Sequence, residues 1–303
     1  MLFLPLVFLI AAPDQASLLA EPSLGDHPQS ARSIGMGGAM RGIADGVDAL
    51  YVNPAGMSMK KRYVIDGGYS WTQDANAHRP GAAIMDSATT SVAAGASYNF
   101  ERRFNSGQLD VHRINFALAY NIGGFLGIGA TFKYLDATRV AYDKIFDPNT
   151  AAPRANITPY PAQRILSFSG DVSAMLTPIQ YFSIAISGHN LIPNPVWAEL
   201  TPLGMGMAAA VHVAGLEVDF DAVIDFTTLK KAAVRYHFGA EYAIAGMVPL
   251  RAGFIHDDVG FDNFWSFGAG FRHPSFGIDF GYRQSIARPE NRTIAFGVQY
   301  YMN

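Results

Sequence analysis

The chain has 303 residues, of which 50% are hydrophobic and only 16% are charged, and its formal net charge is −3. Glycine is abundant at 30 residues, aromatic residues make up 13%, and cysteine is absent. This composition is too apolar for a disordered chain, and it has no thiol for a disulfide scaffold or a thiolate metal site. It lacks the basic excess of a nucleic-acid binder. Beyond the N-terminus, no apolar run reaches the roughly 18 residues of a membrane-spanning helix.

The first twelve residues, MLFLPLVFLIAA, form an apolar stretch. Its length suits the hydrophobic region of a secretory signal peptide, although no basic residue precedes it. We therefore assign residues 1–20 to a signal peptide, with Ala20 as a candidate cleavage position. The alternative is a buried N-terminal strand or helix.

From residue 61 onward, apolar and polar residues alternate in short segments. In the segment 111–121, for example, Ile114, Phe116 and Leu118 share one face, while Asn115 and Ala117 lie on the other. A period of two indicates strands with one apolar and one polar face. The predicted strands are 61–73, 77–86, 90–100, 111–121, 124–135, 163–176, 179–190, 203–213, 215–226, 233–243, 247–256, 263–273, 275–284 and 292–301.

The connections between these segments alternate between short and long, as they do in outer-membrane barrels. The segment 77–86 has poor alternation and contains Pro80, but it is needed to make the number of strands even. Tight joins are predicted at Ile122–Gly123, Thr177–Pro178, Ala214–Gly215, Ala245–Gly246 and His273–Pro274. Longer joins are predicted at 101–110, 136–162, 191–202, 227–232, 257–262 and 285–291.

Alternation is also compatible with a soluble β-sandwich. Here, however, the apolar faces recur with similar strength in every segment, and the opposite faces are rich in Gly, Ser, Asn and Ala rather than in Lys and Glu. Tyrosines gather near the segment ends, where a membrane–water interface suits their amphipathic rings. The sequence therefore predicts an all-β fold: a transmembrane antiparallel barrel of about 14 strands, in contact with outer-membrane lipids.

The segment 30–57, SARSIGMGGAMRGIADGVDALYVNPAGM, is unlike a strand. Its glycines allow positive φ and close backbone approach. Residues 43–51 are predicted to form a short helix, which Pro54 ends because the residue before a proline avoids the helical region. A compact glycine-rich plug followed by a short helix fits the inside of a barrel.

This segment resembles the FadL-like outer-membrane protein family, which includes long-chain fatty acid transporters and PorV-type secretion barrels. The matching pattern is S-A-R-S-x-G-M-G-G-A at 30–39, followed by A-D-x-x-x-A-L-Y-x-N-P-A-G at 44–56. The resemblance implies a barrel over residues 61–303 and an N-terminal hatch over residues 21–60 that closes the lumen. The hatch residues it implies are Gly35, Gly37, Gly38, Asp45, Tyr51, Asn53, Pro54, Ala55 and Gly56. This chain is shorter than typical fatty acid transporters of the family, and the difference falls in the external loops.

Ionisable residues on the inward faces are interpreted as pairing with one another and with the hatch backbone, since buried charges need partners. The acids Glu217, Asp219, Asp221 and Asp225 offer oxygen ligands, but residues two apart on a strand simply form its wet face. Ser183 and Ser187 lie near His189 in sequence, yet no G-x-S-x-G elbow is present. We therefore predict no catalytic residue, metal site or cofactor.

Two functions of different class are compatible with these features. One is a passive transporter, in which a hydrophobic small molecule rests against the hatch and leaves sideways or downward. Pro80 is the candidate for a lateral gap, because proline removes a donor from the strand ladder. The other is a PorV-like interaction barrel that holds a secreted protein partner. A structural barrel without a substrate is a third, simpler possibility.

Overall fold

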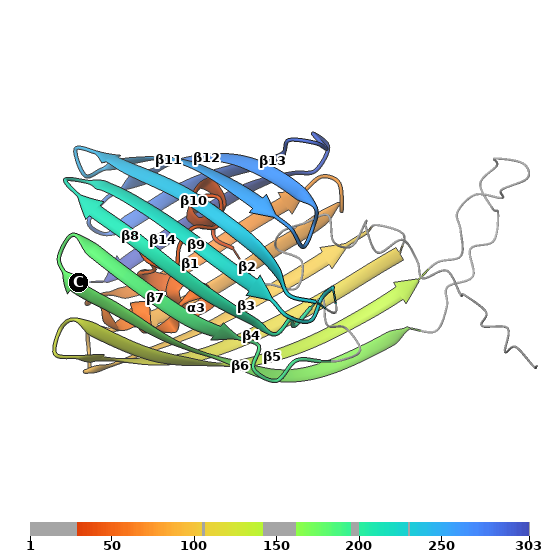
Figure 1. The fold of residues 1–303 in the computed structure, drawn as a ribbon, viewed down its shortest axis with the longest axis horizontal. Helices are drawn as coiled ribbons and strands as arrows, with labels where there is room; N and C mark the ends of the chain where they lie inside the picture. Colours follow the sequence, from red (N-terminus) through yellow and green to blue (C-terminus); the bar gives the residue numbers. More distant parts are fainter. Residues whose placement is uncertain (1–28, 105–106, 142–161, 195–199, 230, 303) are drawn as a thin grey trace, which may run out of the picture.

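The computed structural model describes residues 29–104, 107–141, 162–194, 200–229 and 231–302 (Figure 1). Within these ranges, 14 strands form a closed antiparallel barrel in which β1 pairs with β14. The strands are β1 (Tyr63–Thr72), β2 (Ala77–Asp86), β3 (Val92–Arg103), β4 (Gly107–Ile122), β5 (Leu126–Ala141), β6 (Gln163–Ile179), β7 (Phe182–His189), β8 (Gly204–Val213), β9 (Leu216–Asp225), β10 (Ala233–Ile244), β11 (Val248–Asp257), β12 (Asp262–Arg272), β13 (Phe276–Ser285) and β14 (Arg292–Met302). The predicted fold is confirmed. The predicted signal peptide and hatch residues 21–28 lie outside the described residues.

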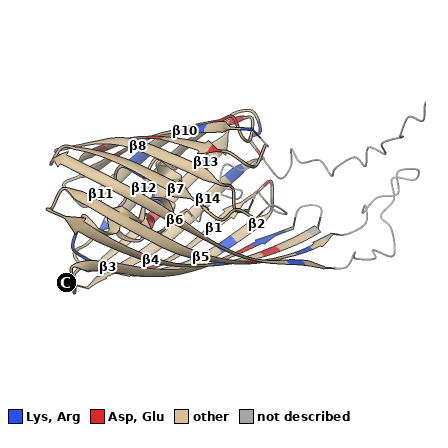
Figure 2. Cartoon of the chain, turned by 60° about the horizontal axis from the view of Figure 1, so that its bottom comes forward, with Lys and Arg blue, Asp and Glu red and all other residues tan. Residues whose placement is uncertain are grey.

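The two faces of the strands have the predicted polarity. On β4, Phe116 and Leu118 are 55% and 60% exposed on the outer surface, whereas Asn115 and Ala117 between them are buried toward the lumen. Charged residues occupy only short stretches of the strands (Figure 2). An apolar exterior around a polar interior is the pattern of a transmembrane barrel.

One end of the barrel carries the tight turns, together with the start of β1 and the end of β14. Ala214 and Gly215, between the paired Val213 and Leu216, both have positive φ, as the common type I′ two-residue hairpin turn requires. Ala245 and Gly246 also have positive φ, within a three-residue connection between the paired Ile244 and Val248. The turn predicted at Thr177–Pro178 is wrong, because both residues belong to β6. The β6–β7 register shifts between Leu176 and Ile179, and such an irregularity accommodates a proline that cannot donate to the ladder.

The strands β3, β4 and β5 are longer than predicted. Their pairing continues through most of the segments 101–110 and 136–141, which were expected to be loops. Cross-strand ion pairs support this extension: Arg102 forms two 2.8 Å contacts with Asp110, and Arg164 lies 2.6 Å from Asp136. These segments were predicted to be loops because they carry charged residues and lack the alternation of apolar and polar residues that marks the rest of each strand.

The hatch, residues 29–62, fills the lumen between the strands (Figure 1). It contains α2 (Ala31–Gly35), η1 (Gly46–Asp48), α3 (Ala49–Val52) and η2 (Pro54–Ser58). The helix predicted over 43–51 is therefore shorter and begins later, and α2 was not predicted. The helix does end before Pro54, as expected. No helix in the described ranges is long and apolar enough to cross a membrane.

Candidate functional site

The first part of the hatch is the short helix α2 followed by a glycine turn. The side chain of Ser30 caps α2 by accepting a 3.0 Å hydrogen bond from the Ser33 N–H. Gly35 ends the helix, and Gly37 and Gly38 then adopt φ of +65° and +78°. A Cβ on Gly37 would lie 2.9 Å from the Phe254 backbone nitrogen. Glycine is thus required for both conformation and space.

The barrel wall beside this turn is also made of glycine. Gly239, Gly253, Gly268 and Gly281 lie on β10 to β13, and each faces hatch backbone that an added Cβ would strike. A Cβ added to Gly268, for example, would lie 3.1 Å from the Cα of Gly35. The hatch backbone therefore packs directly against the wall.

The turn after Ala39 is bound by two carboxylates of β9. Asp221 accepts hydrogen bonds from the backbone N–H groups of Met40 (3.1 Å) and Arg41 (3.2 Å), and Asp219 accepts one from Gly42 (3.0 Å). The Arg41 guanidinium forms a 3.1 Å ion pair with Asp221. These acids were expected to pair with the hatch backbone, and they do. In the described part of the chain, no group of three or more His, Asp or Glu could hold a metal.

Arg32 of α2 is the second hatch arginine that binds the wall. Its three nitrogens reach Glu241 (3.0 Å) and Glu217 (2.7 Å) on the strands and Asp45 (2.9 Å) within the hatch. Lys60 also approaches Asp45, at 2.7 Å. Although burial alone would raise the pKa of Asp45, the nearby cations Arg62 (3.2 Å), Lys60 and Arg32 hold it well below its usual range. Asp45 therefore joins the start of the hatch to its end.

Asp48 and Tyr51 lie deeper in the hatch. Burial raises the pKa of Asp48 to about 6, and one of its carboxylate oxygens has no hydrogen-bond partner. Burial also raises the pKa of the Tyr51 phenol. The Tyr51 hydroxyl lies 3.5 Å from Asn99 of β3. Tyr51 also lines two small cavities between the hatch and the strands.

The Asn53–Gly56 segment joins the hatch to β5 and β6. The Asn53 side chain donates to the Arg41 carbonyl at 2.8 Å, and the Ala55 N–H donates to Ser173 Oγ at 2.9 Å. An added Cβ at Gly129 of β5 would lie 2.5 Å from the Ala55 nitrogen. Pro54 opens η2, and Gly56 closes the turn through a 2.9 Å bond to the Asn53 carbonyl.

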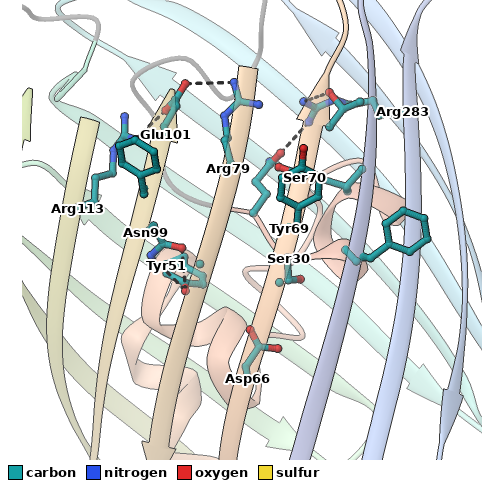
Figure 3. Close-up of a pocket in the computed structure, with 18 residues that line it drawn as sticks. Ser30, Tyr51, Asp66, Tyr69, Ser70, Arg79, Asn99, Glu101, Arg113 and Arg283 are labelled. Carbon is teal, nitrogen blue, oxygen red and sulfur yellow. Dashed lines mark hydrogen bonds and ion pairs between the residues drawn. The ribbon is translucent and has the colours of Figure 1, made fainter. Parts of the chain in front are cut away.

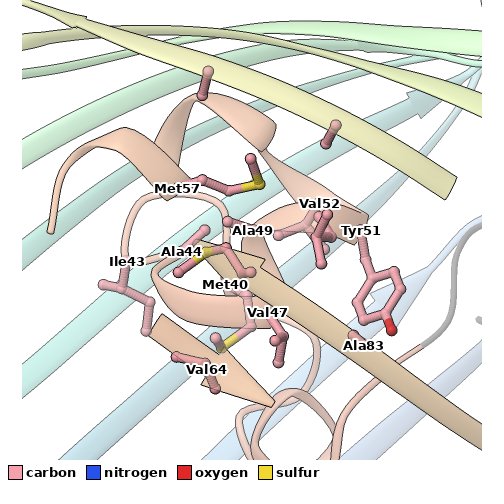
Figure 4. Close-up of a cluster of buried hydrophobic side chains, with 14 of the residues drawn as sticks. Met40, Ile43, Ala44, Val47, Ala49, Tyr51, Val52, Met57, Val64 and Ala83 are labelled. Carbon is pink, nitrogen blue, oxygen red and sulfur yellow. The ribbon is translucent and has the colours of Figure 1, made fainter. Parts of the chain in front are cut away.

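An apolar cluster holds the remaining side of the hatch against β1–β4 (Figure 4). Leu50, Val52 and Met57 from the hatch are almost fully buried there. The strands contribute mainly small side chains, such as Ala93 and Ala117. This cluster contains no ion pair, so burial of apolar surface stabilises this side of the hatch.

Two small cavities lie between the hatch and the loop end of the barrel. The first, about 60 Å³, lies beside β1–β3 (Figure 3). At one end Glu101 pairs with Arg79 (3.2 Å) and Arg113 (2.8 Å), and Asp66 lies at the opposite end. We call the second, about 30 Å³, the β4–β6 cavity. It is lined by Tyr51, Arg113, Asn115, Lys133, Tyr134, Leu135, Ser167, Ser169, Asn190, Leu200 and Thr201.

The lumen becomes apolar immediately beyond the β4–β6 cavity. Val111, Leu135, Ala137 and Leu200 form a buried cluster, with Leu109 and Ile165 packed against it. We call this group the outer apolar cluster. Leu135 and Leu200 belong to both the cluster and the cavity, so the two adjoin. The sequence did not indicate this cluster, because Leu109, Ala137 and Leu200 fall in predicted loops, and Val111, Leu135 and Ile165 fall near the ends of predicted strands.

Pro80 lies within β2, on the outward face. It pairs in register with Tyr69 of β1, but on the β3 side the paired positions pass from His78 to Gly81 and omit Arg79 and Pro80. The missing N–H of proline explains this interruption. The first cavity is lined by Tyr69, Arg79 and Gly81, so it lies directly behind the interruption.

Ser187, His189 and Asp171 are brought together in the lumen. Ser187 Oγ lies 2.7 Å from His189 Nε2, and His189 Nδ1 lies 3.1 Å from Asp171. This order of groups occurs in hydrolases. Here, however, Ser187 is only 2% exposed, and it lines neither of the two cavities. Asp171 also forms an ion pair with Lys133, whose Nζ lies 2.6 Å from the carboxylate. The arrangement is a buried polar network.

No family model matches the chain, and no curated protein matches it in sequence. Solved structures do match. A FadL homologue from Pseudomonas aeruginosa superposes with a TM-score of 0.70 at 10% identity, covering 91% of this chain and 99% of the homologue. The chain has a FadL-like fold. The toluene transporter TbuX from Ralstonia pickettii (TM-score 0.65, 12% identity, 92% and 99% covered) and the monoaromatic hydrocarbon channel CymD (0.64, 12%, 90% and 97%) resemble this FadL-like barrel in the same way.

Proposed function

We propose that this FadL-like barrel lies in the bacterial outer membrane and passively transports small hydrophobic molecules, fatty-acid-like ones included. The outer apolar cluster is the main support for this proposal. It places apolar side chains on the luminal face of β4–β6, directly above a cavity that the hatch closes. Where Leu135 and Leu200 line that cavity, an apolar group gains free energy by leaving water for contact with them.

The structural neighbours support the same class of substrate. TbuX is a toluene transporter and CymD is a monoaromatic hydrocarbon channel. In this chain, Arg113 and Lys133 line the β4–β6 cavity together with Tyr134 and Leu135. Apolar and cationic groups side by side suit a molecule with an apolar body and an anionic end.

For the exit, we propose a lateral route beside Pro80. Pro80 has no backbone N–H to donate to β3, so separating the strands there breaks fewer backbone hydrogen bonds than at a continuous ladder. The first cavity connects this point to hatch residues Ser30 and Tyr51. A molecule leaving this way reaches the outer-membrane lipids without crossing the whole hatch.

Uptake into liposomes that contain the purified protein tests the transport function. Leu135→Asp places a charge in the outer apolar cluster, and we expect it to lower the uptake of radiolabelled octanoate and naphthalene at least tenfold. Leu135→Met, which conserves volume and polarity, is the matched control and should retain uptake. Equal uptake by the two variants would argue against the proposal.

Mass spectrometry of the purified protein separates transport from the PorV-like alternative. A transporter is expected to carry a lipid-like small molecule in its lumen. A co-purifying protein together with an empty lumen would favour the interaction barrel.

A further inference from the structure

A continuous chain of buried polar contacts runs from the β4–β6 cavity to the hatch. Lys133 lines the cavity, and its Nζ lies 2.6 Å from Asp171 of β6. Asp171 accepts a 3.1 Å hydrogen bond from His189 Nδ1 on β7. His189 Nε2 in turn accepts a 3.4 Å hydrogen bond from Nε of Arg41, and Arg41 pairs with Asp221 at 3.1 Å.

All five residues of this series of polar contacts are largely buried. The Lys133 side chain is 14% exposed, and those of Asp171, His189, Arg41 and Asp221 are 4% exposed or less. A buried charge needs a partner of opposite charge. A change in the charge or position of one residue in the series therefore alters the pairing or protonation of the next. Asp221, the last residue in the series, also accepts hydrogen bonds from the backbone N–H groups of Met40 and Arg41.

His189 fits its place in this chain as the neutral imidazole. Its Nδ1–H donates to Asp171, which leaves Nε2 to accept from Arg41 and from Ser187. A protonated ring would carry hydrogen on both nitrogens and could accept from neither. It would also place a positive charge beside the Arg41 guanidinium. Lys133 therefore protects the contact with Arg41, because it neutralises Asp171 and removes the reason for His189 to take up a proton.

We propose that Lys133, Asp171 and His189 are positioning residues that link occupancy of the β4–β6 cavity to the contact between Arg41 and Asp221. An anionic group bound in the cavity draws Lys133 away from Asp171. The carboxylate then needs a new cation, and His189 supplies it by taking up a proton. The protonated ring repels the Arg41 guanidinium. The turn at Met40–Gly42 then loses its contacts with Asp219 and Asp221 of β9. This inference rests on the proposed function, since it assumes a ligand in that cavity.

The groups facing His189 set the direction of the pH dependence. They are Asp171 on β6, Lys133 on β5, Ser187 on β7 and Arg41 of the hatch, with Asp219 and Asp221 of β9 beyond Arg41. Lys133 and Arg41 oppose a proton on the ring, whereas Asp171 favours it. Removing the Lys133 charge therefore favours protonation, and the hatch should loosen more at low pH than at high pH.

The test uses the natural absence of cysteine in this chain. Ala39→Cys places one thiol in the fully buried hatch turn, and its labelling rate by a polar maleimide reports hatch release. Lys133→Met should raise this rate at least tenfold, with a larger increase at pH 5.5 than at pH 8. Lys133→Arg keeps the charge and should label as slowly as the Ala39→Cys parent.

Asp171→Asn is the decisive matched variant, because it breaks the same ion pair and gives the opposite prediction. An amide at this position can accept from His189 without attracting a proton, so the ring stays neutral and labelling should remain slow. Octanoate should accelerate labelling in the parent but not in Asp171→Asn, and octanol should have no effect. Equal labelling rates for Lys133→Met and Asp171→Asn, fast or slow, would overturn the proposal, as would an octanoate response absent from the parent.

Failure of the transport function would look different. In that case Leu135→Asp and Leu135→Met would take up octanoate equally, while Lys133→Met and Asp171→Asn would still differ in labelling.

Discussion

The hatch meets two unlike surfaces inside the barrel. On the β9–β10 side, Arg32 and Arg41 form ion pairs with Glu217, Glu241 and Asp221, and the Gly42 N–H donates to Asp219. On the β1–β4 side, Leu50, Val52 and Met57 pack among small side chains without any ion pair. Ion pairs depend on geometry and on protonation, whereas apolar burial depends mainly on area. The first surface therefore responds to changes of charge and protonation, whereas the second depends on apolar burial alone.

Arg41→Leu should have the largest effect on this comparison. It leaves Asp219 and Asp221 buried without a cation, and removing one partner of a buried pair costs about 3–5 kcal/mol. We expect labelling of Ala39→Cys to rise at least a hundredfold. Adding Asp221→Asn should restore part of the protection, because the amide still accepts from the Met40 N–H. No restoration would mean that Asp221 holds the hatch only through Arg41.

Leu50→Ala tests the apolar surface. Loss of a fully buried leucine costs about 2–5 kcal/mol, since it leaves a cavity as well as losing burial. A thiol at Ala49 should label faster in this variant, while a thiol at Ala39 should change much less. Arg41→Leu should give the reverse order. If both variants accelerate both sites equally, the hatch leaves as one unit and the two surfaces do not act separately.

Asp48→Asn tests a charge that is buried without full compensation. Its pKa is raised to about 6, so folding binds a proton between the usual value near 4 and pH 6. The contribution of Asp48 to the free energy of unfolding should therefore fall as pH rises from 4 to 6. The variant should be more stable above pH 6, by up to about 3 kcal/mol, and unchanged at pH 4. Denaturant unfolding in detergent at these pH values measures this; equal stability at pH 7 would contradict it.

Ser173→Ala should have the smallest effect. It removes the acceptor for the Ala55 N–H, at a cost of about 1 kcal/mol. Labelling at Ala49 should rise a few-fold at most. Ser167→Ala, on the same strand but outside the hatch contacts, should leave labelling unchanged. A large effect at Ser173 would place the main attachment of the hatch on β6 instead of β9.

Much of the fold could be predicted from the order of residues. Alternation marked every strand except β2, because a barrel wall with an apolar and a polar side imposes a period of two; β2 was predicted from the even strand count. The prediction was less accurate at the extended ends of β3–β5, where the outward face carries Arg102 and Asp110. There the outward face is polar as well as the inward face, so alternation no longer distinguishes a strand from a loop.

The hatch was also recognisable in the sequence, but its attachments were not. Gly37 and Gly38 indicated a tight turn through their conformational freedom, a local property that a sequence displays directly. That Asp221 would bind Arg41 could not be read, because 180 positions separate them. The inward faces supplied several acids and bases of equal chemical type, and nothing local selects one pairing from another.

The amino-acid sequence by itself determined which strand residues face outward, how many strands close the barrel, and where a glycine-rich segment precedes them. These features follow from local conformational preference and from the polarity of the two solvents. The tertiary structure alone decided which charges meet, where the luminal cavities lie, and that a polar chain joins Lys133 to Arg41. The physical reason is that barrel closure and strand register bring distant residues within hydrogen-bond distance, and neither is a local property.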